Sequence, residues 1–190
     1  MDLEGMTLAC ATRTEARAAR RLRGRAVVVG IGARRDVPDG RLVSFGLAGG
    51  LHDGLGCGDV LDATRVVTTD GSVLWEGAPL GVAGAKAATI LASDRVVDDP
   101  EERRLLHEST GADAVDMESG ALAATGRLVG CLRAVSDTPS RTLGPLATAL
   151  GPDGRVRVTG LVRALARPRE TARAVRDVRR ALRSLAEVAT

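Results

Sequence analysis

The sequence contains very few aromatic residues. Phe45 and Trp75 are the only two in 190 residues, and tyrosine is absent. Proteins that bind single-stranded nucleic acid stack its bases on aromatic side chains, so this composition argues against such a partner. No run of apolar residues approaches the roughly 20 needed for a transmembrane helix. The N-terminal residues include acids where a secretory signal would carry basic residues, so we expect no signal peptide.

Cysteine and histidine are also scarce. The three cysteines, Cys10, Cys57 and Cys131, are widely spaced, no two form a CxxC pair, and the only histidines are His52 and His107. We therefore expect neither a disulfide framework nor a zinc site. A reducing cytoplasm is the expected location.

Charge is distributed unevenly along the chain. Residues 155–190 contain ten arginines and three acids, a net charge of +7, whereas the preceding 154 residues carry a net charge of −4. A basic segment of this kind can contact nucleic acid or an anionic membrane surface. Here, however, apolar residues recur every three or four positions, which predicts a helix that packs on the protein and leaves its arginines in solvent. These residues are Ala172, Val175, Val178, Leu182, Leu185 and Ala189. Nucleic acid is therefore not an expected partner.

The first 137 residues alternate short apolar runs with helical patterns, which predicts an α/β domain with a layered sheet. The predicted strands are 6–10, 26–29, 41–45, 59–67, 89–91, 112–115 and 128–135. The predicted helices are 12–23, 100–109 and 119–125, followed by a loop over 138–154 and further helices at 160–166 and 168–188. We predict a single domain over residues 1–190, with 155–190 as a basic helical extension packed on it.

Three segments have residues that suit chemistry. In the glycine-rich run 46–50, followed by Gly58-Asp59, the backbone can approach an anion or a sugar closely. Asp116-Met117-Glu118 follows a strand, where Glu118 can accept hydrogen bonds from two adjacent hydroxyls of a ribose. Asp137 ends the last strand of this region, and burial there would raise its pKa toward that of a general acid. Taken singly, the three are more simply a turn, an acid at a helix N-terminus and a capping aspartate.

Together and in this order, the segments resemble the nucleoside phosphorylase/nucleosidase superfamily. The matching motifs are AGG at 48–50, GD at 58–59, DME at 116–118 and RAVSD at 133–137. Residues 112–119, 133–141 and the tail from 150 onward are most similar to the phosphorylase of hopanoid biosynthesis, which acts on adenosylhopane. The resemblance implies a three-layer α/β/α phosphorylase-like domain with a mixed central sheet. Some helices are lost, because only 33–40 follow Gly32 where a full helix is typical, and a second helix is missing between Val67 and Thr89.

The resemblance also implies an activity, a purine nucleoside phosphorylase-type glycosyl transfer. Adenine would leave an adenosyl lipid and ribose phosphate would form, with inorganic phosphate as co-substrate and no other cofactor. Asp137 would be the catalytic acid at the purine, and Glu15 would orient the nucleophile or a sugar hydroxyl, or be an ordinary helix acid. Met117 and Glu118 would bind the ribose. The remaining implied contacts are Ala48 and Gly49 along the pocket, Trp75 and Ile90 at the base, and Arg13 and Gly30 at the phosphate.

Hydrolysis is the alternative that the resemblance also allows. It is favoured by Glu15, which lies where the nucleosidases carry the carboxylate that activates water, and by the hydroxyl lost at Leu47. Leu47 stands where purine phosphorylases carry a Ser or Thr that holds phosphate, and Ser44 stands where some carry a basic residue. The alternative function is therefore a hydrolytic nucleosidase acting on a small adenine nucleoside such as methylthioadenosine or S-adenosylhomocysteine. The resemblance further implies a homo-oligomer. A lipid-linked substrate would add peripheral contact with the inner face of the membrane.

Overall fold

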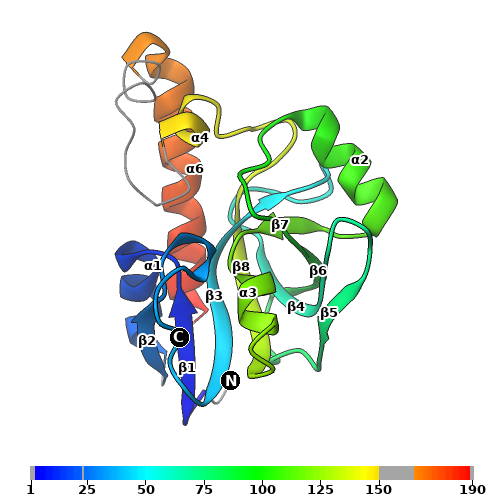
Figure 1. Cartoon of the computed structure of the whole chain (residues 1–190). Helices are drawn as coiled ribbons and strands as arrows, with labels where there is room; N and C mark the ends of the chain where they lie inside the picture. The colour runs from blue at the N-terminus through cyan, green and yellow to red at the C-terminus, as the bar shows by residue number, and fades with distance from the viewer. Residues whose placement is uncertain (1–2, 23, 150–164, 189–190) are drawn as a thin grey trace.

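The computed structural model describes residues 3–22, 24–149 and 165–188, in which one mixed sheet is flanked by helices (Figure 1). The strands are β1 Met6–Cys10, β2 Arg25–Val28, β3 Arg41–Gly50, β4 Val60–Val67, β5 Val73–Glu76, β6 Lys86–Ala92, β7 Ala114–Asp116 and β8 Leu128–Asp137. The α-helices are α1 Arg13–Ala18, α2 Pro100–Thr110, α3 Ser119–Ala123, α4 Pro145–Ala149 and α6 Pro168–Glu187. Two short 3-10 helices are η1 Ala19–Arg21 and η2 Ile31–Ala33.

The sheet closes on itself. Its strands follow the order β2-β1-β3-β7-β6-β4-β5, and β8 pairs with both β3 and β4. Strands β3, β7, β6, β4 and β8 therefore form a ring, in which β3–β7 and β4–β8 are antiparallel and the other pairs are parallel. The prediction of a mixed central sheet is confirmed, and five of its strands close into a ring. Closure satisfies the backbone of β8 on both sides and removes two sheet edges, in a chain with few helices to cover an open sheet.

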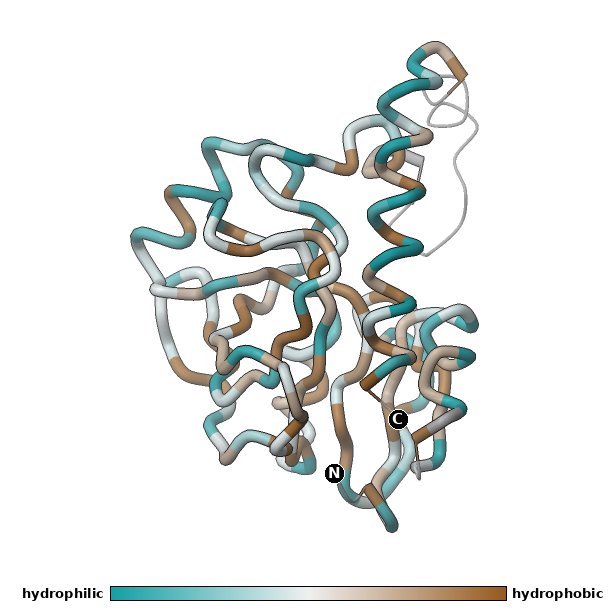
Figure 2. Tube along the Cα trace, turned by 180° about the vertical axis from the view of Figure 1, so that it is seen from behind, coloured by the Kyte–Doolittle hydropathy of each residue, from teal (hydrophilic) through white to brown (hydrophobic). Residues whose placement is uncertain are grey.

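Apolar side chains of β8 alternate between two cores. Cys131 and Val135 belong to the core under α3, whereas Leu132 and Ala134 belong to the core under α1 and α6. Figure 2 shows hydrophobic segments in the strands and alternating hydrophilic and hydrophobic turns along α6. Helices therefore lie on both faces of the β3–β8 pair. Among the described residues, no helix combines the length and the apolar character that crossing a bilayer requires.

Short loops take the place of the missing helices. Ala33 at the end of η2 and Val37 in the segment after it pack on the core under α3. Between β4 and β6 the chain forms β5 and then a loop whose Leu80 and Val82 pack on the core under α1 and α6. The buried Asp62 carboxylate anchors this loop by accepting backbone N–H groups. Its partners are the amides of Leu80 (2.9 Å), Gly81 (2.9 Å) and Val82 (3.2 Å).

Three local predictions differ from the structure. The glycine-rich run lies inside β3 rather than in a turn, because residues 46–49 pair with β8 and Gly50 pairs with β7. The region predicted as a loop after 138 contains α4. The buried face of α6 is centred on Ala174, Asp177, Ala181 and Leu185, and Ala172 is exposed. The small alanines let α6 approach β8 closely, and this rotates the helix from the face that its larger residues predict. Residues 160–164 of the predicted helix 160–166, and Ala189, lie outside the described residues.

We expect Asp62→Ala to destabilise the protein by roughly 2–4 kcal/mol, because three backbone N–H groups lose a buried acceptor. Urea unfolding measures the change. Asp39→Ala is the matched control, since that side chain is fully exposed, and it should alter stability by no more than about 0.5 kcal/mol. A loss at Asp62 as small as at Asp39 would show that the loop does not depend on this anchor.

Candidate active site

Three of the predicted site residues lie on β3 and β8, which run parallel at the centre of the sheet: Ala48 and Gly49 in β3, and Asp137 at the end of β8. Gly46 pairs with Arg133, and Gly49 pairs with Asp137. The register shifts between Ala48 and Gly49, which leaves Ser136 as an extra residue in β8, as in a β-bulge. The Ser136 hydroxyl donates to the Ala48 carbonyl at 3.2 Å. Arg133 and Asp137 are each the centre of a group of charged side chains. Their partners in β3, Gly46 and Gly49, are three residues apart.

Arg133 is the centre of the first charged group. Its guanidinium is completely buried, forms an ion pair with Asp116, and has Nη1 3.5 Å from Glu118 Oε2. Nη2 also donates to the hydroxyls of Ser44 (2.5 Å) and Ser119 (3.1 Å). Burial by itself lowers the pKa of Arg133, but the Asp116 and Glu118 carboxylates raise it above its ordinary value. The guanidinium is therefore a permanent cation, although its Nε has no partner in the described part of the chain.

Glu118 lies at the junction of β7 and α3. Its side chain is buried, and Oε1 accepts the Gly32 N–H of η2 at 3.0 Å. Burial raises the pKa of Glu118 to about 7, against the opposing effect of Arg133, and the nearby Asp116 and Glu15 raise it further. Close to neutral pH, this carboxyl changes between its proton-donating and proton-accepting forms.

Glu15 lies on the other side of Arg133. Its Oε2 caps α1 by accepting the Thr12 N–H (2.7 Å) and hydroxyl (2.9 Å), and its Oε1 accepts the Leu47 N–H of β3 at 3.0 Å. The side chain is buried and fits only because position 46 is glycine. A Cβ there would overlap Glu15 Oε1 and lie 2.7 Å from Arg133 Nη1. Glu15 therefore belongs to the group around Arg133 as well as to the helix cap.

Asp137 is the centre of the second charged group. It is buried, forms an ion pair with Arg103 of α2, and accepts the Ser136 hydroxyl at 2.5 Å. Burial raises the pKa of Asp137 and Arg103 lowers it, with the first effect the larger. Gly49 lies against this pair, since a Cβ there would be 3.2 Å from both Asp137 Oδ2 and Arg103 Nη2. The structure therefore gives Glu118 and Asp137 separate arginine partners, Arg133 of β8 and Arg103 of α2.

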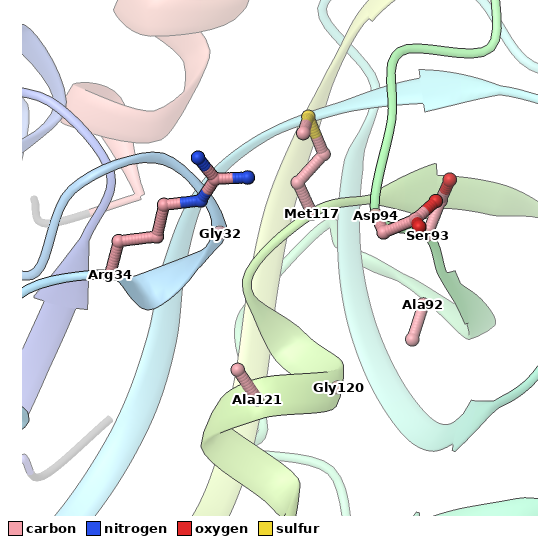
Figure 3. Close-up of a pocket in the computed structure, with 8 residues that line it drawn as sticks. All are labelled: Gly32, Arg34, Ala92, Ser93, Asp94, Met117, Gly120 and Ala121. Carbon is pink, nitrogen blue, oxygen red and sulfur yellow. The ribbon is translucent and has the colours of Figure 1, made fainter. Parts of the chain in front are cut away.

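A cavity of about 300 Å³ lies beside the first group (Figure 3). Gly32 and Met117, the neighbours of Glu118, form part of its wall, and Figure 3 shows the Arg34 guanidinium on one side of Met117 and Asp94 on the other. The remaining lining residues are Ala92, Ser93, Gly120 and Ala121. Among the described residues, no cluster of His, Cys, Asp and Glu has the arrangement of a metal site.

Four predicted contacts lie elsewhere. Ile90 is completely buried in the core under α3, and Trp75 packs on the outside of that core, so neither lines the cavity. Arg13 is exposed in the first turn of α1. Gly30 adopts a left-handed conformation (φ 80°) before η2 and lies under the Arg35 side chain.

Several site residues were not predicted from the sequence. Asp116 and Arg133 lie within the quoted motifs, and a charged residue inside a buried strand is a signal that could have identified Arg133. Arg103 gives no such signal, because it is one of many arginines and lies in a helix with a polar pattern. Arg34 and Asp94 lie in short loops without a motif.

The whole chain resembles solved nucleosidase structures. The 5′-methylthioadenosine/S-adenosylhomocysteine nucleosidase of Helicobacter pylori superposes with a TM-score of 0.58 at 16% identity, over 87% of this chain and 99% of the other. The corresponding enzyme from Neisseria meningitidis gives 0.57 at 19% identity, over 92% and 98%. Futalosine hydrolase of H. pylori gives 0.55 at 15%, over 93% and 97%. The chain has the fold of these nucleosidases. No family model and no curated protein matches the sequence.

At this level of identity the similarity establishes the architecture alone, and the hopanoid enzyme named by the sequence resemblance is not among these structures. Several of the nucleosidase structures contain ligands, including 5′-methylthioadenosine in one and adenine in another. The roles of Glu15, Glu118 and Asp137 in this chain rest on their own geometry.

We expect Gly46→Ala to destabilise the protein by about 1–3 kcal/mol, because the methyl group overlaps two buried charged side chains. Gly56→Ala is the control, since the nearest atom to its added Cβ is 3.8 Å away. Chemical unfolding of both variants measures the difference. If Gly46→Ala and Gly56→Ala were equally stable, Glu15 and Arg133 would be able to move away from the added methyl group without a loss of stability.

We expect the raised pKa of Glu118 to make stability depend on pH. Between pH 4.5, the ordinary pKa, and about 7, the unfolded state releases this proton while the folded state keeps it. The free energy of unfolding should therefore fall as pH rises through this window and level off above it. Urea unfolding of the wild type and Glu118→Gln across pH 4–8 isolates the effect. A constant difference between the two proteins would contradict it.

Proposed function

We propose that the protein hydrolyses the N-glycosidic bond of an adenine nucleoside. The observation that carries this proposal is the excess of carboxyls in the first charged group, where Asp116, Glu118 and Glu15 surround Arg133. The wall of the cavity beside this group adds one charge of each sign, Arg34 and Asp94. Cleavage of this bond builds positive charge on the sugar as the base departs. A fixed anionic environment stabilises that charge in the transition state.

Each carboxyl has a distinct task in this reaction. Glu118, with Met117 beside it, binds the ribose hydroxyls after they displace the Gly32 N–H. Glu15 orients the water and takes its proton as the oxygen bonds to the anomeric carbon. Asp137 gives its proton to the departing purine nitrogen, so that the base leaves as a neutral molecule.

The same charge distribution disfavours phosphate as the nucleophile. A phosphate dianion beside Glu15 and Glu118 would meet like charges, and Arg133 already pairs with carboxylates. Leu47 supplies no hydroxyl to this position. Arg13, the sequence-based candidate for phosphate, lies exposed in α1.

Phosphorolysis of an adenosyl lipid, which leaves ribose phosphate on the lipid, is the second candidate. It is favoured by the sequence resemblance and by one structural observation. The exposed Val73 and Leu74 lie on β5, and Leu74 Cδ1 is 3.5 Å from the Cβ position of Gly120 in the cavity wall. An apolar tail could leave the cavity over this strand. A homo-oligomer is expected for either reaction. Contact with the inner face of the membrane belongs to this candidate alone, and cosedimentation with liposomes tests it.

Adenine release decides between the two reactions. We expect methylthioadenosine or S-adenosylhomocysteine to yield adenine and a free sugar at a rate that inorganic phosphate does not raise. Chromatography of the products with and without phosphate, and with an adenosyl lipid as the third substrate, makes the measurement. Strict dependence on phosphate would overturn hydrolysis in favour of the second candidate.

Variants of the three carboxyls test their roles. Glu15→Gln, Glu118→Gln and Asp137→Asn should each lower kcat/KM by about 10²–10⁴-fold, the usual loss when a general acid or base is removed. Glu101→Gln, an exposed change in α2, is the control and should leave the rate unchanged. Full activity in any of the three would remove that residue from the mechanism.

A further inference from the structure

Arg103 is buried although the rest of its helix is polar. The side chain is 1% exposed and leaves α2 toward the carboxyl ends of β3 and β8. Its Nε donates to the Val97 carbonyl at 2.9 Å, and its Nη1 donates to the Gly50 carbonyl at 3.2 Å. These two bonds hold the guanidinium in one place, with Nη2 directed at Asp137.

A second carboxylate faces the same Nη2 nitrogen. Asp98 Oδ1 lies 3.8 Å from it, in the segment between β6 and α2. Asp98 is itself fixed, because its two oxygens accept the backbone N–H groups of Leu143 (3.0 Å) and Gly144 (3.1 Å). Nη2 of Arg103 therefore lies between two carboxyls. It contacts Asp137, and a small movement would bring it into contact with Asp98.

We propose that Asp98, Arg103 and Asp137 form a charge-sharing triad that controls when Asp137 holds a proton. Arg103 pairs with Asp137 while that carboxyl is ionised, and it turns to Asp98 when Asp137 carries the proton intended for the departing base. Asp98 and Arg103 are then positioning residues, because they act on the substrate only through Asp137. The use of that proton rests on the proposed function, whereas the triad itself does not.

The proton balance of the cycle is simple. The O–H bond of protonated Asp137 breaks as an N–H bond forms on the purine, and the resulting carboxylate pairs with Arg103 again. After the base leaves, Asp137 takes a proton from solvent and Arg103 returns to Asp98. No oxidant, metal or other reactant is consumed.

The two positioning residues act in opposite directions. The Arg103 cation favours the ionised form of Asp137, whereas the Asp98 anion disfavours it, since each of two neighbouring carboxylates opposes the ionisation of the other. A loss of structure alone would not produce shifts of opposite sign. The other charged or titratable groups that act on Asp137 from the elements around it are Asp177 of α6, which is paired with Arg141, and the Cys57 thiol.

The experiment is a pH titration of the Asp137 carboxyl carbon by NMR in the full chain without substrate, with Asp137→Asn identifying the signal. Arg103→Met should raise the pKa of Asp137 by at least about one pH unit, and Asp98→Asn should lower it by about half a pH unit. Arg104→Met and Asp53→Asn, which alter a neighbouring exposed pair, are the matched controls and should leave the titration unchanged. The alkaline limit of kcat should move in the same direction as the titration in each variant.

Opposite shifts in the two variants support the triad, and shifts in the same direction or an unchanged titration overturn it. If Arg103→Met does not fold, Arg103→Lys replaces it. In that variant the pKa of Asp137 should stay close to its wild-type value, and the shift in Asp98→Asn alone then decides the outcome. The titration also separates the two proposals. If the two variants shift the pKa of Asp137 in opposite directions but the protein releases no adenine, the triad is supported and the proposed function is refuted. If the protein releases adenine but the titration of Asp137 is unchanged in both variants, the function is supported and the triad is refuted.

Discussion

The buried ion pair between Arg133 and Asp116 is the interaction on which the site depends. Arg133 lies within β8, where a charge without a partner would cost several kcal/mol, and Asp116 at the end of β7 compensates it. Asp116 also accepts the Ser119 N–H at 3.0 Å and so begins α3. This pair therefore joins two sides of the ring and fixes the turn that carries Met117 and Glu118. Removal of one partner of such a pair typically costs about 3–5 kcal/mol.

Glycine at two positions of β3 makes room for this chemistry. Gly46 leaves space for Glu15 and Arg133, and Gly49 leaves space for Asp137 and Arg103. Glycine inside a strand lowers its intrinsic stability, and here the pairing of β3 with β8 along eight residues compensates that loss. The familiar role of a glycine-rich run is a turn that exposes its backbone. In this protein its role is to let buried charges approach a strand.

The short chain builds its sheet with few helices. Ring closure, the Asp62-anchored loop and the segment after η2 together cover surfaces that helices would otherwise cover. The short segment after Gly32 leaves Arg34 and Gly32 at the wall of the cavity beside Met117.

The local sequence pattern was sufficient to predict where most helices and strands lie and to identify the acidic motifs. Most strands follow their apolar runs, and α2 begins at the capping Asp99 followed by Pro100, because these signals depend on neighbouring residues alone. Which charges meet could not be read in this way. Arg103 reaches Asp137 across 34 positions, and Glu15 reaches Leu47 across 32, through the crossing of α1, α2 and the ring. The sequence by itself determined the strands, the helices and the carboxyls available for chemistry. Only the tertiary structure decided which arginine neutralises which acid, because burial makes each such pairing obligatory while chain topology selects the partner.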